Sequence, residues 1–280
     1  MTLRNTIKNL SKSLFLDQDT TRSIDSLIAN VSEKAQRYFL HDLHLIGAFG
    51  SYSRNTLLPR QMDSRTVIDV MVCLNISSKM ASDHLNYLQQ FVEHVFPNQN
   101  FSRTPRSLTL HFSPYPVRLL PAVASDAAAY RIPARSTAGW LYINPTECMR
   151  RLEFADQFNR GMVRPLIRVA KYWNATHDYP FHPFEIEQAI INKGYQYSGG
   201  LFSAPDLFDY VYDFLTHPPT MQETLTWKLQ AIRRTQIYLE RARRLDAGSR
   251  KQAAIKCITK VLPPIPTKPT TNIGQVWLGA

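Results

Sequence analysis

The sequence is poor in cysteine, which limits the ways in which its fold can be stabilised. The three cysteines, Cys73, Cys148 and Cys257, lie far apart and form no CxxC pair. An odd number without a metal-binding pattern argues against a disulfide framework and against a structural zinc site. Such cysteine usage is typical of a reducing compartment, and we therefore expect a cytoplasmic protein.

Long hydrophobic runs are also missing. No apolar stretch approaches the roughly 18 residues of a membrane-spanning helix, and the residues after Met1 lack the apolar centre of a signal peptide. We therefore expect no membrane association. Gly-x-Ser-x-Gly, Walker and dinucleotide-binding motifs are absent too, which argues against the hydrolases, P-loop proteins and Rossmann enzymes that carry them.

Acidic residues are outnumbered in this chain of 280 residues. Asp and Glu number 22 against 33 Lys and Arg, which gives a formal net charge of +11. The excess favours an acidic partner such as a nucleic acid, a nucleotide or an anionic protein surface. Predicted basic helices over 222–260 are one candidate surface for RNA or DNA. A solvated helix face or a docking site for an acidic protein explains the same pattern.

The residues that are present alternate between strand and helix patterns in the first half and form helices in the second. We predict helices within 1–42 and over 51–57 and 81–96, and strands over 43–49, 66–74, 108–112 and 117–122. Later helices are predicted from Asn144-Pro145 and over about 163–175, 183–195, 204–216, 222–246 and 249–261. This predicts an α+β fold with a mixed lobe at 1–140, a helical lobe at 141–262 and a loose Pro/Thr-rich tail at 263–280.

The stretch from Phe49 to Leu74 carries the most informative pattern. Gly50 and Ser51 form a predicted turn between a strand and a helix, and the N–H groups of a helix start favour phosphate. The following strand carries a single acid, Asp69. A carboxylate at that point suits the metal ion that accompanies a nucleoside triphosphate.

The order and spacing of these residues, over roughly 40–190, resemble the bacterial cGAS/DncV-like nucleotidyltransferases (CD-NTases), relatives of the animal oligoadenylate synthetases. The elements that carry the resemblance are Gly50-Ser51-Tyr52, Arg54, Thr56, Leu58-Pro59-Arg60, Asp63, Ile68-Asp69-Val70-Met71-Val72, Leu119-Leu120-Pro121-Ala122, Tyr130-Arg131-Ile132-Pro133, Gly139-Trp140, Asn144-Pro145 and Lys171-Tyr172-Trp173-Asn174. The resemblance implies a polymerase-β-like palm and a helical C-terminal lobe. It also implies the joining of nucleoside triphosphates into cyclic or linear oligonucleotides, which serve as anti-phage signals.

The same resemblance implies two Mg²⁺ ions held by three acids, of which this chain keeps one. The second acid falls on Asp69, whereas the first falls on Val67 and the third on Arg118. Valine offers no ligand, and arginine places a fixed positive charge where an ion should lie. We therefore expect Asp69 to be a residual catalytic residue and at most a weak metal ligand, with Mg²⁺ as a cofactor only if the protein is active.

Two phosphate-binding candidates have a structural alternative. Arg118 is suited to bind phosphate beside Gly50 and Ser51, or to form an ion pair with Asp69. Lys171 matches a lysine that faces the triphosphate in the family, and is otherwise a solvated helix lysine. His182-Pro183-Phe184 departs from the Ser-Tyr pair of the family, although Phe184 can still stack on a base.

These observations favour a catalytically inactive member of the family. Such a protein would act as a sensor or scaffold that binds a nucleotide, an oligonucleotide, a nucleic acid or a protein partner of a defence system. The alternative is an active nucleotidyltransferase that makes a cyclic or linear oligonucleotide.

Overall fold

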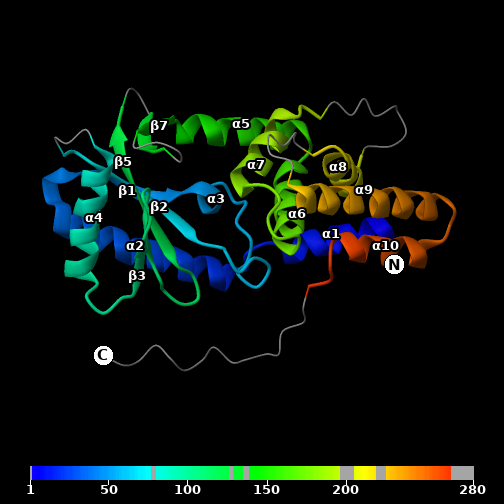
Figure 1. Ribbon diagram of the computed structural model, residues 1–280, viewed down its shortest axis with the longest axis horizontal. Coiled ribbons are helices and arrows are strands. Elements are labelled where there is room, and N and C mark those ends of the chain that lie inside the picture. The colour runs from blue at the N-terminus through cyan, green and yellow to red at the C-terminus, as the bar shows by residue number, and fades with distance from the viewer. Residues whose placement is uncertain are drawn as a thin grey trace.

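The structure is a computed structural model that describes residues 2–76, 80–125, 129–134, 139–195, 205–218 and 225–265. Figure 1 shows an elongated molecule with a β-sheet and two covering helices at one end and a bundle of helices at the other. The predicted α+β architecture, a polymerase-β-like palm with a helical lobe, is therefore confirmed. No helix in the described ranges is both long and apolar enough to cross a membrane.

The described residues form a seven-stranded mixed sheet. Its main path runs β1-β2-β5-β4-β3, and β6 and β7 extend it from β5. The strands are β1 (Leu43–Phe49), β2 (Ile68–Leu74), β3 (Phe101–Arg103), β4 (Leu108–Leu110), β5 (Val117–Ala124), β6 (Tyr130–Pro133) and β7 (Trp140–Ile143). The central strands β2 and β5 are parallel, and the other pairs are antiparallel.

One face of the sheet is covered by α2 (Gln18–Phe39) and α4 (Ala81–Val95). Val70 and Val72 of β2 point to this side, where they pack in one core with Phe39 of α2 and Phe91 of α4. On the opposite face, Met71 belongs to a much smaller cluster. Because side chains alternate along a strand, Asp69 shares the side of Met71, and this sparsely covered face carries the candidate site.

The helical lobe follows the sheet in the chain. It consists of α5 (Pro145–Phe158), α6 (Val163–Thr176), α7 (Pro183–Asn192), α8 (Leu207–Thr216), α9 (Thr226–Ala247) and α10 (Lys251–Val261). Trp173 of α6 is buried at its centre and donates from Nε1 to Oγ1 of Thr235 in α9 at 2.8 Å. This bond satisfies the polar atom that a buried tryptophan brings into a core.

The first helix belongs with the helical lobe and not with the sheet. Leu3 and Ile7 of α1 (Leu3–Ser13), and Leu14 beyond its end, are fully buried in the same core as α6 and α8. In Figure 1, α1 lies beside α10. Although α1 precedes the sheet in the chain, its apolar side chains are therefore buried against the helical lobe.

Several predicted elements are confirmed with shifted ends. The helix predicted at 51–57 is α3 (Gly50–Ser53), which is followed by Asn55 at φ 56°. A short 3-10 helix, η1 (Leu40–Asp42), separates α2 from β1. Of the predicted helix over 222–246, the first three residues lie outside the described residues, as does the tail beyond residue 265.

Candidate functional site

The sheet register brings the predicted site residues together. Asp69 of β2 lies opposite Arg118 of β5, which in turn lies opposite Thr109 of β4, and Phe49 of β1 lies on the other side of Asp69. Val67 directly precedes β2 and is half-buried, two residues from Asp69 and therefore on the same side. The positions at which the resemblance predicts three acids are thus neighbours on one face, and only one of them is an acid.

Arg118 forms an ion pair with Asp69. Its Nε donates to Oδ1 of Asp69 at 2.6 Å, and the two side chains are 39% and 14% exposed. Of the two roles predicted for Arg118, the structure contains the ion pair. Since the pair is partly solvated, it adds less than about 1 kcal/mol to the free energy of unfolding. Binding of phosphate by Arg118 stays a prediction.

Gly50 packs directly against the same carboxylate. A side-chain Cβ at this position would lie 2.6 Å from Oδ2 of Asp69, and the backbone has φ +71°. Only glycine adopts this conformation without strain. The turn is therefore held close to Asp69, with one carboxylate oxygen beneath Gly50 and the other on Arg118.

The two remaining predicted site residues, Ser51 and Lys171, meet in a buried network with Arg54, Thr56 and Glu187, and we call these five residues the Glu187 cluster. Lys171 of α6 donates from Nζ to Glu187 of α7, to Oγ of Ser51 at 2.9 Å and to the carbonyl oxygen of Thr56 at 3.1 Å. Glu187 also accepts from Nε of Arg54 at 2.7 Å and from Oγ1 of Thr56 at 2.7 Å. The cluster thus joins the helical lobe to the segment after the Gly-Ser turn.

The Glu187 cluster contains one carboxylate, that of Glu187, and two cations, Lys171 and Arg54. The Glu187 side chain is 0% exposed, and burial acts to raise its pKa. The positive charges of Lys171 and Arg54 outweigh this effect and hold the pKa of Glu187 at about 2. Glu187 is therefore ionised, and it occupies the donors of Lys171 and Ser51 that the sequence predicted to face a phosphate.

Glu187 was missed in the sequence, although a signal was present. It lies next to Ile186 and three residues before Ile190, both of which are buried in the core of the helical lobe. A glutamate within the apolar stripe of a helix is rarely left unpaired, because burial of a lone charge is strongly unfavourable. Its partners lie on the preceding helix, at Lys171, and in residues 51–56, so they could not be read from the spacing within α7.

The donor set does not fit a pair of magnesium ions. Across the described parts of the chain, no group of three or more His, Cys, Asp or Glu side chains is placed to hold a metal. Mg²⁺ requires a near-octahedral shell that is mainly oxygen. Asp69 supplies one carboxylate, Val67 supplies no donor, and Arg118 already binds an Asp69 oxygen.

A small pocket lies where the sheet meets the helical lobe. Its volume is about 50 Å³, and it is lined by Phe49, Ser53, Arg54, Ile143, Pro145, Cys148, Met149 and Phe184. The Arg54 guanidinium carbon lies 5.5 Å from the centre of the Phe184 ring. Ligand pockets usually measure roughly 300–1,000 Å³, so a nucleotide does not fit here unless the two lobes separate.

Comparisons with known proteins agree with the fold. The model of the Second Messenger Oligonucleotide or Dinucleotide Synthetase (SMODS) domain matches residues 1–154. CdnC of E. coli MS115-1, solved in a complex with HORMA-deltaN, is 15% identical with a TM-score of 0.68, over 92% of this chain and 96% of that chain. The same CdnC solved with ATP is 14% identical with a TM-score of 0.68, over 95% of this chain and 99% of that chain.

A third similar structure is the cyclic AMP-GMP synthase DncV of Vibrio cholerae, in complex with the linear intermediate 5' pppA(3',5')pG. It is 11% identical with a TM-score of 0.67, over 92% of this chain and 94% of that chain. No curated protein matches the sequence. Since the SMODS model covers more than half of the 280 residues and the similar folds are CD-NTases, the chain belongs to the SMODS family of cGAS/DncV-like nucleotidyltransferases.

Proposed function

We propose that this protein keeps the nucleotidyltransferase fold without nucleotidyl transfer, and that it acts by binding a partner. The observation that carries the proposal is the 2.6 Å ion pair between Arg118 and Asp69. It uses the one acid on the face that the resemblance assigns to two metal ions. The other two positions, Val67 and Arg118, supply an apolar side chain and a cation in place of acids.

Electrostatics support the loss of activity. A divalent ion about 4 Å from a guanidinium is repelled by several kcal/mol in a partly buried site. Transfer of a nucleotidyl group requires positive charge on the phosphates and an activated attacking hydroxyl, which two metal ions normally provide. Arg118 can supply positive charge, but it has no lone pair to accept a proton and cannot activate a hydroxyl.

The Glu187 cluster, which joins the helical lobe to the segment after the Gly-Ser turn, supports the same proposal. A triphosphate on Ser51 and Lys171 would have to displace the Glu187 carboxylate, which already accepts from Lys171, Arg54 and Thr56. We therefore expect nucleotides and oligonucleotides to bind weakly through Gly50, Ser51, Arg118 and Lys171. In our proposal these residues chiefly hold the junction together.

We further propose that the partner is a protein of a bacterial anti-phage system in the cytoplasm. The support for this step is the likeness to CD-NTases, together with the complex that CdnC forms with HORMA-deltaN. A folded, nucleotide-free scaffold can present the same surfaces to a partner that an active relative presents.

The proposal is tested by incubating the full chain with radiolabelled ATP, GTP, CTP and UTP in the presence of Mg²⁺ or Mn²⁺. We expect no oligonucleotide product on thin-layer chromatography. A product that disappears in Asp69→Ala, but persists in the control Asp19→Ala at an exposed position of α2, would overturn the proposal and establish the active alternative.

A gain-of-function variant sharpens the test. Val67→Asp combined with Arg118→Asp restores two carboxylates beside Asp69 on the same face. Synthesis by this variant, with none by the unmodified chain, is the result expected if only the metal ligands have been lost. Equal synthesis by both chains would contradict the proposal.

A further inference from the structure

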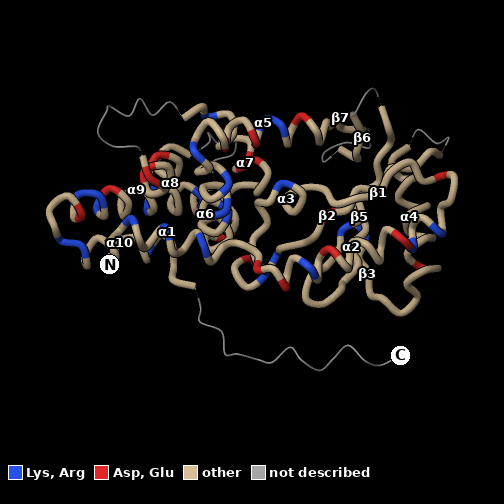
Figure 2. Tube along the Cα trace, turned by 180° about the vertical axis from the view of Figure 1, so that it is seen from behind, with Lys and Arg blue, Asp and Glu red and all other residues tan. Residues whose placement is uncertain are grey.

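The positive charge of the protein is concentrated at the end of the helical lobe. Helices α9 and α10 pack against each other as a hairpin over 226–261, which we call the basic hairpin. It contains ten Lys and Arg residues and two acids, and therefore carries +8 of the formal net charge of +11. Figure 2 shows these Lys and Arg residues along α9 and α10, at the end of the molecule away from the sheet.

Few carboxylates lie at ion-pair distance from these charges in the part of the chain that the structure describes. Within the described ranges, the only basic-hairpin cation with a carboxylate at ion-pair distance is Arg244, whose side chain is 83% exposed and lies 3.6 Å from Glu240. Elsewhere, cations commonly have such partners: Arg4, Arg22, Arg37, Arg54, Arg118, Arg150, Arg164, Lys171 and Lys193. The contrast leaves the hairpin as a surface of available positive charge.

Three of the exposed arginines, Arg233, Arg241 and Arg244, lie on one side of α9. The buried positions of this helix are Ile232, Thr235, Leu239 and Ala242, which face the core of the lobe. On the opposite side, exposed residues recur at helical spacing. They are Arg233, Ile237, Arg241 and Arg244, which we call the α9 stripe. From Arg233 to Arg244, Ile237 is the only exposed large hydrophobic residue.

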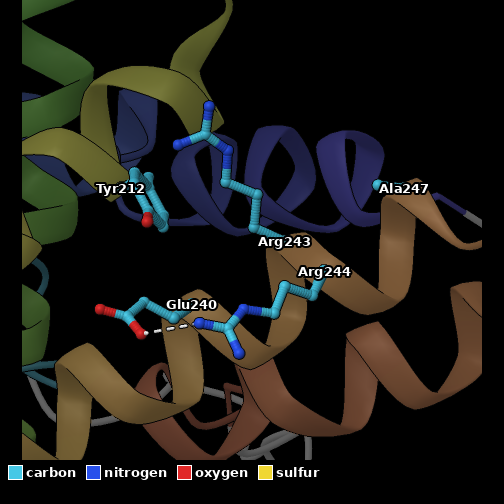
Figure 3. Close-up of a pocket in the computed structure, with 5 residues that line it drawn as sticks. All are labelled: Tyr212, Glu240, Arg243, Arg244 and Ala247. Atoms are coloured by element: carbon cyan, nitrogen blue, oxygen red, sulfur yellow. Dashed lines mark ion pairs between the residues drawn. The ribbon is translucent and has the colours of Figure 1, made fainter.

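A hollow opens beside this stripe, between α8 and α9. Its volume is about 370 Å³, and it is lined by Tyr212, Glu240, Arg243, Arg244 and Ala247 (Figure 3). The guanidinium carbon of Arg243 lies 4.6 Å from the centre of the Tyr212 ring. An aromatic ring and arginine planes around one hollow are suited to stack a base and to hold the phosphate beside it.

We propose that the basic hairpin binds nucleic acid, with the α9 arginines on backbone phosphates and the Tyr212 hollow at one nucleotide. Charge complementarity carries the choice of partner, because phosphodiesters present one negative charge per nucleotide to a row of arginines of which, among the described residues, only Arg244 has a carboxylate at ion-pair distance. An acidic protein fits less well, since protein interfaces depend on clustered apolar anchors. Ile237 is the only such residue exposed among the arginines from Arg233 to Arg244, and the exposed Trp227 and Leu229 lie in the first turn of α9, before the arginines begin. The inference is independent of whether the Asp69 site is active.

The test measures fluorescence anisotropy of a labelled single-stranded RNA and a labelled duplex DNA, each about 30 nucleotides long, from about 50 to 200 mM salt. The test variant is Arg233→Gln, Arg241→Gln and Lys251→Gln, all at exposed positions. The control is Arg22→Gln, Arg37→Gln and Arg150→Gln, which removes the same net charge from exposed sites on α2 and α5.

Binding of either probe that weakens steeply with salt is the expected result. The test variant should bind at least about tenfold more weakly and reduce the slope of log K against log salt by about 2 to 3, whereas the control should change little. Thermal unfolding of both variants checks that the fold is intact. The relative affinity of the two probes identifies the preferred nucleic acid.

Two results would overturn the inference. One is the absence of binding to both probes at about 50 mM salt, or equal losses in the test and control variants. The other is displacement of the probe by polyglutamate at the same charge concentration as by unlabelled nucleic acid. That result would assign the basic hairpin to an acidic protein.

Discussion

Replacement of Glu187 by glutamine removes the negative charge that balances two buried cations. Lys171 and Arg54 are almost fully buried, at 5% and 8% side-chain exposure, and both contact this carboxylate. The glutamine keeps the shape and one acceptor but leaves the two positive charges without an anion. The variant therefore measures the ionic contribution of the cluster with little change in packing volume.

The expected loss follows from the pKa of Glu187. A carboxyl whose pKa falls from 4.5 to about 2 on folding contributes about 3 kcal/mol to the free energy of unfolding at neutral pH. Breaking a buried ion pair from one side typically costs about 3–5 kcal/mol. Equilibrium urea unfolding of Glu187→Gln should therefore show a loss of about 3 kcal/mol or somewhat more.

The pH dependence gives the same experiment a second readout. Because the folded-state pKa of Glu187 is lowered, its contribution is complete above about pH 5 and is lost as the pH falls toward about 2. The difference between the unmodified chain and Glu187→Gln should shrink over that interval. Glu153→Gln, at an exposed glutamate of α5, serves as the control and should change stability by less than about 0.5 kcal/mol.

A loss below about 1 kcal/mol in Glu187→Gln would refute the reasoning, because that is the range of a surface pair and not of a buried one. A loss of the expected size that does not change between about pH 5 and 2 would also refute it. In that case the hydrogen bonds, and not the charge of Glu187, would hold the junction.

Three further predictions concern the turn, the ion pair and the cysteines. Gly50→Ala should destabilise the protein more than Gly161→Ala in urea unfolding. Both glycines have positive φ, but only a Cβ added at position 50 would meet a carboxylate oxygen, at 2.6 Å. Equal losses in the two variants would contradict the close approach of the turn to Asp69. Arg118→Gln should lower the free energy of unfolding by less than about 1 kcal/mol, since its ion pair is partly solvated, and a loss above about 2 kcal/mol would mean that the pair is buried in solution. Iodoacetamide at pH 8 should label Cys148 before Cys73, because burial raises the pKa of the Cys73 thiol to about 11; peptide mass spectrometry checks the order, and faster labelling of Cys73 would contradict it.

The central strands could be predicted well from the sequence, because their signal is local. The run Ile68–Leu74 is apolar on both faces except at Asp69, which is typical of a strand in the middle of a sheet. The resemblance then placed Arg118 beside Asp69, and the sheet register confirms that the two are neighbours. Strands such as Tyr130–Pro133 were missed, because they are short and include an arginine and a proline.

The contacts of the Glu187 cluster could not be predicted, because residues 51–56 are separated from Lys171 and Glu187 by more than a hundred residues. Ser51 and Lys171 were singled out for phosphate, and the structure places both at a carboxylate of α7. Residue type and helix spacing show that a lysine can reach an anion, but they do not show which anion. Only the packing of α6 and α7 against the segment after the Gly-Ser turn determines that choice.

Because α1 packs in the helical lobe, a single cut in the chain before α5 does not divide the molecule into two parts with complete cores. A fragment that begins at α5 would lack Leu3, Ile7 and Leu14, and the core that they complete would be open to water. A fragment that ends before α5 would carry the same three apolar side chains without anything to cover them. An engineer who wishes to study the helical part alone therefore has to splice α1 onto it, by circular permutation or by adding the N-terminal peptide in trans.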